Sequence, residues 1–258
     1  MKGPFICSII EKRQLAPEIF SITVEKPSEM TEITSGQFMN IQCGEGLFPL
    51  LRRPISVCQA DNNKIQFVVR VAGKGTELLC SRKVGDTLDI LGPLGNGFTI
   101  DDKMKDVLIV GGGIGTAPLV ELTKNLKDKR TRVILGFRSQ PYLIDEFETY
   151  AKNVQVATED GSCGHKGYVT DLAIEEIKSE KPDLVYACGP EIMLKRVQEI
   201  CVQYGIPSQL SIEERMACGI GGCLVCSCKV KAEEAGWKYV RTCKEGPAFS
   251  GEEVIFHD

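Results

Sequence analysis

Histidine is almost absent from this chain of 258 residues, which contains only His165 and His257. Histidine is the usual acid–base group near neutral pH and a frequent metal ligand, so its scarcity leaves little for either chemistry. Basic residues are not in excess, because 31 lysines and arginines stand against 35 aspartates and glutamates, a net charge of −4. A nucleic-acid partner is therefore not expected.

A membrane-spanning segment is also lacking. The longest apolar run, from Val107 to Val120, is diluted by glycine. It is shorter than the roughly 20 residues needed to cross a bilayer. The residues from Met1 to Glu11 contain no apolar stretch followed by a small-residue cleavage site. We therefore expect a cytoplasmic protein with no membrane insertion.

Cysteine, in contrast, is abundant, with 12 residues. In a reducing compartment, clustered cysteines are better explained as metal ligands than as disulfides. Five of them cluster near the end of the chain: Cys218, Cys223, Cys226, Cys228 and Cys243. Six scattered ones are interpreted as small residues of the core: Cys7, Cys43, Cys58, Cys80, Cys163 and Cys201.

The clustered cysteines follow the order C-x4-C-x2-C, from Cys218 through Cys223 to Cys226, with Cys243 downstream. This is the plant-type ferredoxin spacing for a [2Fe-2S] cluster, in which a distant fourth thiolate closes the site. Glycines in the loop supply positive φ angles and amides that approach the sulfides closely. The loop glycines are Gly219, Gly221 and Gly222. The pattern indicates a one-electron carrier.

Other interpretations of these cysteines remain open. Zinc prefers two C-x2-4-C pairs, and no second pair surrounds Cys243. Disulfides or plain buried thiols are the further alternatives. Within the cluster interpretation, Cys228 competes with Cys226 for the third position, and the x2 spacing favours Cys226.

The chain divides into three regions, predicted as a multi-domain β and α/β protein. Residues 1–100 show short strands between turns, which is typical of a small antiparallel barrel, with one helix at Gly75–Lys83. The predicted strands are Phe5–Ile10, Ile19–Glu25, Phe38–Gln42, Ile55–Gln59, Lys64–Val71 and Thr87–Leu91.

Residues 101–212 alternate between apolar strands and helices, the pattern of a parallel-sheet α/β domain that binds nucleotides. The predicted strands are Val107–Val110, Arg132–Phe137, Val154–Thr158 and Leu184–Cys188. The predicted helices are Ala117–Lys127, Leu143–Lys152, Val169–Lys178 and Glu191–Tyr204. Residues 213–258 are rich in glycine and cysteine and then form short strands at Cys228–Lys231 and Trp237–Thr242 around a turn, 232–236. A cluster would serve as the core of this region.

Two motifs of the α/β region stand where strands end and helices begin. Glycines at such a turn let the backbone approach a pyrophosphate at the helix N-terminus. The motif residues are Gly112, Gly113, Gly115 and Thr116 in the first loop, and Cys188, Gly189 and Pro190 in the second. Pro118 replaces the third glycine of the usual fingerprint, so a bare glycine turn is the alternative.

In the barrel, an Arg-Pro-Ile-Ser motif is followed by Val-Val-Arg and Gly-Thr. Arginine can clamp a phosphate, and a serine hydroxyl can bond the edge of a planar ring. The candidate residues are Arg53, Pro54, Ile55, Ser56, Val68, Val69, Arg70, Gly75 and Thr76. Surface arginines without a ligand are the alternative.

Taken in this order, Arg53–Ser56, Gly75–Thr76, Gly112–Thr116 and Cys188–Pro190 resemble the ferredoxin-NADP reductase superfamily. With the cysteine run from Cys218 added, the whole chain resembles the electron-transfer subunits of NAD-linked dihydroorotate dehydrogenases of type B.

The resemblance implies a role for each motif. Arg53–Ser56, Val68–Arg70 and Gly75–Thr76 would bind FAD. Gly112–Thr116 and Cys188–Pro190 would receive NADH. The cluster ligands would be Cys218, Cys223, Cys226 and Cys243. Arg138 and Ser139 near the second strand could also meet a 2′-phosphate, so the residues alone leave NADPH open.

NADH gives up two electrons as a hydride, whereas a [2Fe-2S] cluster accepts one at a time, and a flavin converts between the two. No further domain for oxidising dihydroorotate is evident. The resemblance implies an FMN-containing catalytic subunit in a heterotetramer of two of each, acting in pyrimidine biosynthesis. It also implies that residues 216–226 are partly exposed or at the interface. The alternatives are a reductase subunit with a ferredoxin or hydrogenase partner, and a non-enzymatic redox sensor.

Overall fold

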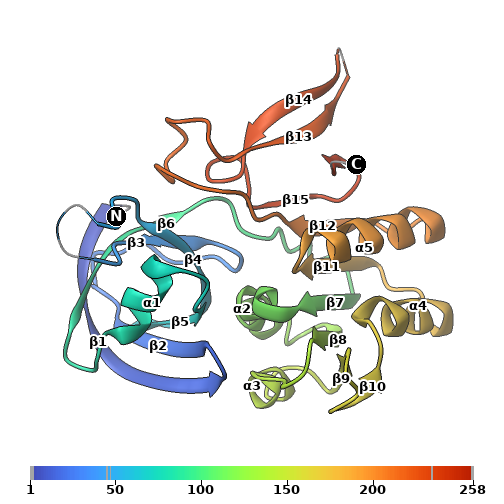
Figure 1. Ribbon diagram of the computed structural model, residues 1–258. Coiled ribbons are helices and arrows are strands. Elements are labelled where there is room, and N and C mark those ends of the chain that lie inside the picture. Colours follow the sequence, from blue (N-terminus) through green and yellow to red (C-terminus); the bar gives the residue numbers. More distant parts are fainter. Residues whose placement is uncertain (1–2, 45, 47, 234, 257–258) are drawn as a thin grey trace.

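The computed structural model describes residues 3–44, 46, 48–233 and 235–256, and its three parts are arranged around one another (Figure 1). A closed barrel and an α/β unit lie side by side, and the C-terminal segment crosses the side where they meet. The predicted fold class is confirmed. In the described part of the chain, no helix is both long enough and apolar enough to span a bilayer.

The barrel closes six antiparallel strands in the order β1-β2-β5-β4-β3-β6. Its elements are β1 (Gly3–Ala16), β2 (Ile19–Glu25), β3 (Phe38–Ile41), β4 (Arg53–Ala60), β5 (Lys64–Arg70), α1 (Lys74–Ser81) and β6 (Thr87–Leu94). The first strand continues well past the predicted end at Ile10. It pairs with β6 up to Ser8 and with β2 from Ile9 onward, so one bent strand serves two neighbours.

Successive side chains of the barrel strands point to opposite faces, and the two faces pack into two different hydrophobic cores. On β5, Phe67 and Val69 point into the barrel with Ile22 and Ile90. Val68, between them, joins the core of the α/β unit, and β4 contacts helix α2. The barrel wall formed by β4 and β5 is therefore buried against the nucleotide unit, which fixes how the two parts sit together.

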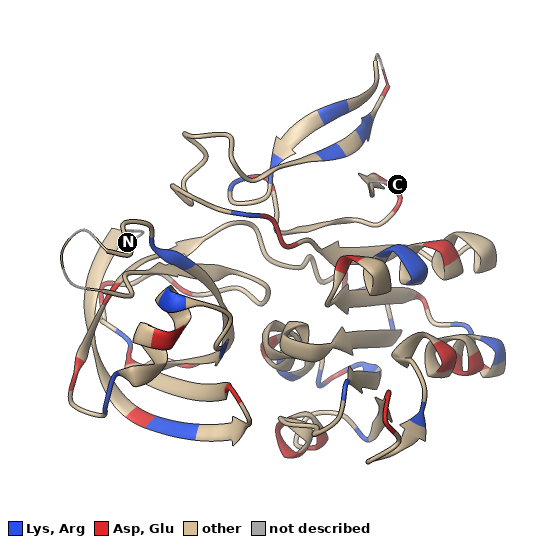
Figure 2. Ribbon diagram, in the orientation of Figure 1, with Lys and Arg blue, Asp and Glu red and all other residues tan. Residues whose placement is uncertain are grey.

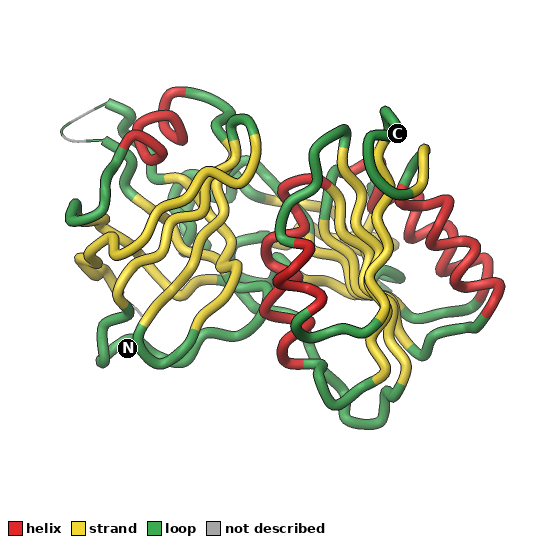
Figure 3. Tube along the Cα trace, turned by 90° about the horizontal axis from the view of Figure 1, so that it is seen from below, coloured by secondary structure: helices red, strands yellow, loops and turns green. Residues whose placement is uncertain are grey.

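The α/β unit has a seven-stranded sheet in the order β10-β9-β8-β7-β11-β12-β15 with helices on both faces (Figure 3). Its strands are β7 (Asp106–Gly112), β8 (Arg130–Phe137), β9 (Asn153–Thr158), β10 (His165–Lys166), β11 (Leu184–Cys188), β12 (Ser208–Ser211) and β15 (Ala248–Ser250). Its helical elements are η1 (Gly113–Thr116), α2 (Ala117–Asn125), α3 (Ile144–Glu148), α4 (Val169–Ser179) and α5 (Glu191–Tyr204).

Two expectations for this unit are wrong. The helix predicted at Leu143–Lys152 is only α3, because Leu143 has the left-handed φ of 65° and the next strand already starts at Asn153. Cys163 is not a core residue but is exposed, since it lies in the turn between β9 and β10. The other scattered cysteines are buried as expected: Cys7, Cys43, Cys58, Cys80 and Cys201.

The C-terminal segment forms a three-stranded sheet in the order β14-β13-β16. Its strands are β13 (Ser227–Ala232), β14 (Gly236–Arg241) and β16 (Val254–Ile255). The predicted hairpin is confirmed around its turn, in which Glu234 lies outside the described residues. Strand β15 lies between β14 and β16 in the chain but is not part of this sheet. It pairs antiparallel with β12, so the C-terminal segment also completes the sheet of the α/β unit.

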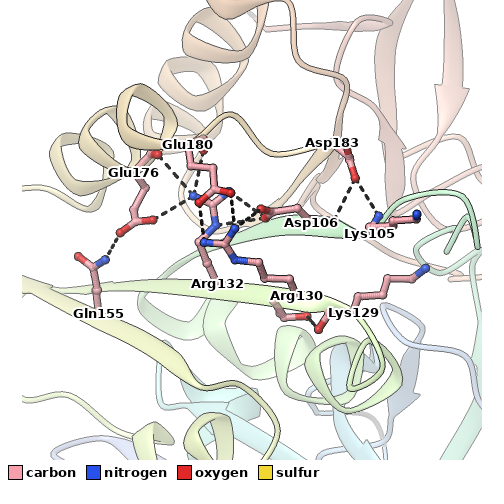
Figure 4. A network of polar contacts seen from close by, with 10 residues as sticks. Lys105, Asp106, Lys129, Arg130, Arg132, Gln155, Glu176, Glu180 and Asp183 are labelled. Carbon is pink, nitrogen blue, oxygen red and sulfur yellow. Dashed lines mark hydrogen bonds and ion pairs between the residues drawn. The ribbon is translucent and has the colours of Figure 1, made fainter.

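An ion network closes the sheet edge at which β7 and β8 begin (Figure 4). Arg132, only 3% exposed, donates to Asp106 at 2.8 Å and to Glu176 at 3.1 Å, and Arg130 bonds Glu180. A buried guanidinium needs such partners because an unpaired buried charge is costly. The network lies at the opposite end of the strands from the glycine loops, so it is structural.

Candidate cofactor sites

The predicted flavin residues lie on neighbouring strands. The Arg53–Ser56 motif is on β4 and the Val68–Arg70 motif is on β5, and the two strands pair antiparallel. Gly75 lies in the first turn of α1 directly beside Arg53. A Cβ at Gly75 would come within 2.7 Å of the Arg53 Nε, so the guanidinium lies directly against this turn and would have to move if Gly75 carried a side chain. Arg53 therefore sits at the positive end of α1, an arrangement suited to a phosphate.

The two adjacent arginines are in different surroundings. Arg52 is bound to Asp89, with its Nη2 at 2.8 Å and its Nη1 at 3.0 Å from the carboxylate oxygens. Arg53 donates only to the backbone carbonyls of Leu51, at 2.7 Å, and Arg52, at 3.3 Å. No ion pair to Arg53 is formed among the described residues. Its charge is thus available for a ligand, whereas that of Arg52 is compensated.

Thr76 has a structural task in the same turn. Its hydroxyl accepts from the amide of Ala72 at 2.8 Å and donates to the carbonyl of Gly73 at 3.0 Å. These bonds fix the chain entering α1, so Thr76 shapes the predicted phosphate site.

The two predicted nucleotide loops are in contact at the carboxyl edge of the sheet. A Cβ at Gly115 would lie 2.6 Å from the backbone of Cys188 and Gly189, and one at Gly112 would lie 3.0 Å from Pro190. The glycines are therefore needed for this close approach. Both motifs contribute to one site, as the sequence predicts.

Tyr142 lies where the flavin and nucleotide motifs meet. Burial raises its pKa to about 12, although a hydrogen bond with the Thr116 side chain and the charge of Arg70 act in the opposite direction. Strand β5 also contacts η1. The end of the predicted flavin motif and the predicted nucleotide loop therefore lie close together beside this tyrosine.

The four predicted cluster ligands lie in two neighbouring pairs. Cys223 is near enough to Cys218 to affect its ionisation, and Cys226 is near enough to Cys243 to do the same. Cys226 and Cys243 are buried, Cys218 is half-buried and Cys223 is exposed. Among the described residues, no three His, Cys, Asp or Glu side chains already lie close enough together to hold one metal ion. The fit to a cluster therefore rests on the four thiols and their loop, which would supply the four thiolates of a [2Fe-2S] cluster.

Backbone amides are directed at the first of these sulfurs. Partial burial raises the pKa of Cys218, but hydrogen bonds from the amides of Ile220, Cys223 and Gly222 and from the Cys223 side chain outweigh it and lower the pKa to about 6. The Gly222 amide lies 3.3 Å from the Cys218 Sγ. Gly219 and Gly221 have positive φ angles of 72° and 86°, which turn the loop around the sulfurs. The donor set and the loop both fit a thiolate-bound cluster.

Cys228 lies in different surroundings from the predicted ligands Cys226 and Cys243. It is 5% exposed and packs with Val230 in the core of the α/β unit, and burial raises its pKa. Its sulfur accepts a long contact of 3.8 Å from the Thr242 hydroxyl. This position supports Cys226, which packs with Cys243 and Phe38, as the third ligand.

The cluster loop rests on the barrel through Asn40. The side-chain amide of Asn40 donates to the carbonyl of Cys218 at 3.3 Å, and Asn40 is paired in the β3–β4 ladder with Pro54 of the flavin motif. Its Oδ1 is buried, with no hydrogen-bond partner in the described part of the chain. One strand, β3, thus separates the predicted flavin site from the cysteine loop.

Sequence models of three protein families match the chain in succession. An oxidoreductase FAD-binding domain matches residues 7–98, and an oxidoreductase NAD-binding domain matches residues 109–199. The iron-sulfur cluster binding domain of dihydroorotate dehydrogenase B matches residues 213–255. The chain therefore carries an FAD-binding, an NAD-binding and an iron–sulfur-binding domain.

Full-length relatives decide the family. The dihydroorotate dehydrogenase B (NAD(+)) electron transfer subunit of Caldanaerobacter subterraneus subsp. tengcongensis is 44% identical over 99% of this chain and 100% of its own length. The chain belongs to the family of dihydroorotate dehydrogenase B electron-transfer subunits. The subunit of Clostridium acetobutylicum is 47% identical over 88% of both chains. The chain is thus an oxidoreductase electron-transfer subunit, and the subunit's name implies a catalytic partner.

Solved structures agree with this assignment. A structure described as an NADH-dependent reduced ferredoxin-NADP oxidoreductase superposes with a TM-score of 0.84 at 35% identity, covering 99% of this chain and 91% of that chain. Phthalate dioxygenase reductase superposes with a TM-score of 0.68 at 18% identity, over 90% of this chain and 88% of that chain. The latter shares the fold.

Sequence reasoning missed two residues that hold the dehydrogenase subunit's cysteine loop in place. Asn40 is one, and Arg241 is the other: its Nη1 donates to the Gly221 carbonyl at 2.8 Å while its Nε bonds Glu245 at 3.0 Å. Neither lies in a motif, and only the fold brings them to the loop.

Proposed function

We propose that this subunit accepts a hydride from NADH and passes its electrons singly through FAD and a [2Fe-2S] cluster to a catalytic subunit that oxidises dihydroorotate. Arg53 and the first turn of α1 hold the FAD pyrophosphate, and Ser56, Arg70 and the backbone of Val69, whose side chain is in the barrel core, lie along its ring and ribityl chain. The glycine loop from Gly112 and the Cys188–Pro190 loop receive NADH. When bound, the flavin supplies the exchange between two-electron and one-electron chemistry.

The order of the three sites in space carries the proposal. The nucleotide loops meet the flavin strand at Tyr142. The flavin motif is in turn linked through Asn40 to Cys218. Each site touches the next, so the chain's own residues align a path from the nucleotide to the cysteine loop. The cluster ligands on that path are Cys218, Cys223, Cys226 and Cys243.

The electron acceptor is proposed to be an FMN-containing dihydroorotate dehydrogenase subunit, joined in a cytoplasmic heterotetramer of two of each. The expected exposure near the cluster supports this: Ile220 is 62%, Leu224 63% and Val225 52% exposed. Exposed apolar side chains at a redox site are suited to docking.

Reconstitution tests the function. The purified subunit is mixed with the catalytic subunit, and reduction of NAD⁺ by dihydroorotate is followed at the absorbance of NADH. We expect turnover only with both proteins present. Turnover by the catalytic subunit alone at the same rate would contradict the proposal.

A second candidate is an NADH-dependent ferredoxin-NADP oxidoreductase subunit. The full-length superposition at 35% identity favours it, although the dehydrogenase subunits are closer in sequence at 44% and 47%. Reduction of ferredoxin by NADH and NADPH, without any response to the dihydroorotate-oxidising subunit, would select this alternative.

A further inference from the structure

The β13–β14 hairpin carries basic and aromatic side chains on one face. Antiparallel pairing sets Lys229 opposite Tyr239 and Lys231 opposite Trp237, so these four side chains share a face, here named the hairpin face. The other face is turned to the α/β unit, where Val230 is buried. The hairpin projects away from the rest of the molecule (Figure 1).

The side chains of the hairpin face form an ordered platform. The rings of Trp237 and Tyr239 meet edge to face, with centroids 5.2 Å apart. The Lys229 Nζ lies 4.7 Å from the Trp237 centroid and 5.9 Å from that of Tyr239, within the range of cation–π attraction. Even so, the two rings are 44% and 59% exposed. Large aromatic side chains held in place yet open to solvent are the residues that anchor protein interfaces.

The charge of the hairpin face is opposite to that of the whole chain. The chain has a net charge of −4, yet the four side chains of the hairpin face include two lysines and no carboxylate, and an acidic neighbour is Glu253, whose carbonyl accepts from the amide of Lys231. Figure 2 shows basic residues along both strands and an acidic residue next to the turn. The chemistry therefore suits an acidic protein surface, which the lysines would attract and the aromatic rings would contact.

The hairpin face adjoins the cysteine loop. Strand β13 starts directly after Cys226, and β14 ends two residues before Cys243. Ser227, on the same face, donates its hydroxyl to the carbonyl of Leu224 at 2.7 Å, which joins the face to the exposed apolar part of the loop. The base of the hairpin face therefore lies beside the cysteine loop.

We infer that the hairpin face is the docking surface for an acidic patch on the electron-accepting protein. The inference rests on the proposed function, in which the acceptor is the catalytic subunit. The cysteine loop passes the electron, and the hairpin face supplies recognition and orientation through Lys229, Lys231, Trp237 and Tyr239.

Charge reversal with a matched control tests this inference. The Lys229→Glu/Lys231→Glu double variant is compared with Lys238→Glu, which lies on the same hairpin but opposite Val230, on its other face. Binding to the catalytic subunit is titrated at low and high salt. We expect the double variant to bind at least roughly tenfold more weakly at low salt and to recover part of this loss at high salt, because two attractive charge contacts become repulsive and salt screens the repulsion. The control should stay within about twofold of the wild type.

The single tryptophan of the chain gives an independent readout. With 5-fluorotryptophan at Trp237, the one ¹⁹F resonance should shift when the catalytic subunit is added. An unmoved resonance in a formed complex, or equal affinities of the double variant and the wild type, would overturn the inference. A shift caused by raising the concentration of this chain alone would assign the face to a second copy instead.

The same samples separate this inference from the proposed function. NADH oxidation with ferricyanide should be equal in all variants, since it needs no protein partner. A wild type that oxidises NADH but does not bind the catalytic subunit would refute the proposed partner, and the docking assignment with it. A wild type that binds while the double variant binds equally well refutes the docking assignment alone.

Discussion

Cys226 and Cys228 are separated by one residue and pack in different clusters. Cys226 packs beside Cys243, whereas Cys228 lies in the apolar core with Val230. We therefore predict that Cys218→Ser and Cys243→Ser each remove the cluster, while Cys228→Ser retains it. Iron and acid-labile sulfide content, measured on anaerobically purified protein, checks this. A normal cluster in Cys226→Ser together with its loss in Cys228→Ser would reverse the ligand assignment.

Arg53 and Arg52 form a second matched pair. Loss of a charge-assisted bond to phosphate costs about 1.5–3 kcal/mol, so Arg53→Gln should weaken FAD binding roughly tenfold to a hundredfold. Arg52 is paired with Asp89 at a half-exposed site, so Arg52→Gln should cost about 0–1 kcal/mol of stability and leave FAD affinity unchanged. Fluorescence titration of apoprotein with FAD measures both. Equal losses of FAD affinity would show that Arg53 has no special role.

At the residue scale, the sequence was most informative where chemistry imposes a spacing. The cysteine order selected Cys226 over Cys228, and the structure separates the two accordingly. The sequence said nothing of Asn40, because a lone asparagine in a strand has no signature until the fold places it under Cys218. The prediction that Cys163 lies in the core is wrong because the local sequence does not distinguish a free cysteine in a turn from one in the core.

At the scale of structural elements, Arg241 links the cysteine loop to the segment 241–247, which carries Cys243. Its guanidinium bonds the Gly221 carbonyl and Glu245 and lies close enough to Cys243 and Cys226 to be influenced by their charge. Reduction adds a negative charge to a cluster, and a nearby cation favours it. Arg241→Gln should therefore shift the cluster potential to more negative values, as measured by redox titration with EPR detection.

Glu245→Gln is the control of opposite sign. It removes the carboxylate charge that compensates the Arg241 guanidinium, so the cluster potential should move to more positive values. If both substitutions moved the potential in the same direction, Arg241 would act only by holding the loop, and the electrostatic account would be wrong.

The regular elements followed from local patterns, and the irregular ones did not. Apolar runs located β7, β8 and β11 because both faces of a parallel sheet are covered. Strand β12, which pairs in parallel with β11, has only four residues and was not predicted. Strand β15 was not predicted either, since its pairing with β12 depends on a return of the chain from beyond the cysteine loop. Strand β15 shows that the C-terminal region is built into the α/β sheet, a long-range link that no local pattern contains.

At the scale of the whole molecule, three sites touch in series. The barrel wall of β4 and β5 is buried against α2 and η1, and the cysteine loop rests on β3. The order of motifs along the chain predicted the three domains, with boundaries near residues 100 and 212. Their contacts in space required the structure. The arrangement explains why one chain combines a barrel, a nucleotide-binding sheet and a cysteine loop.

The most direct test of this account is an anaerobic titration of the purified subunit with NADH, followed by visible absorbance and EPR. We predict that the flavin absorbance bleaches and that a rhombic signal of a reduced [2Fe-2S] cluster develops in the same titration, with no partner present. Protein that contains zinc and no iron, or a flavin that bleaches without any EPR signal, would contradict the relay.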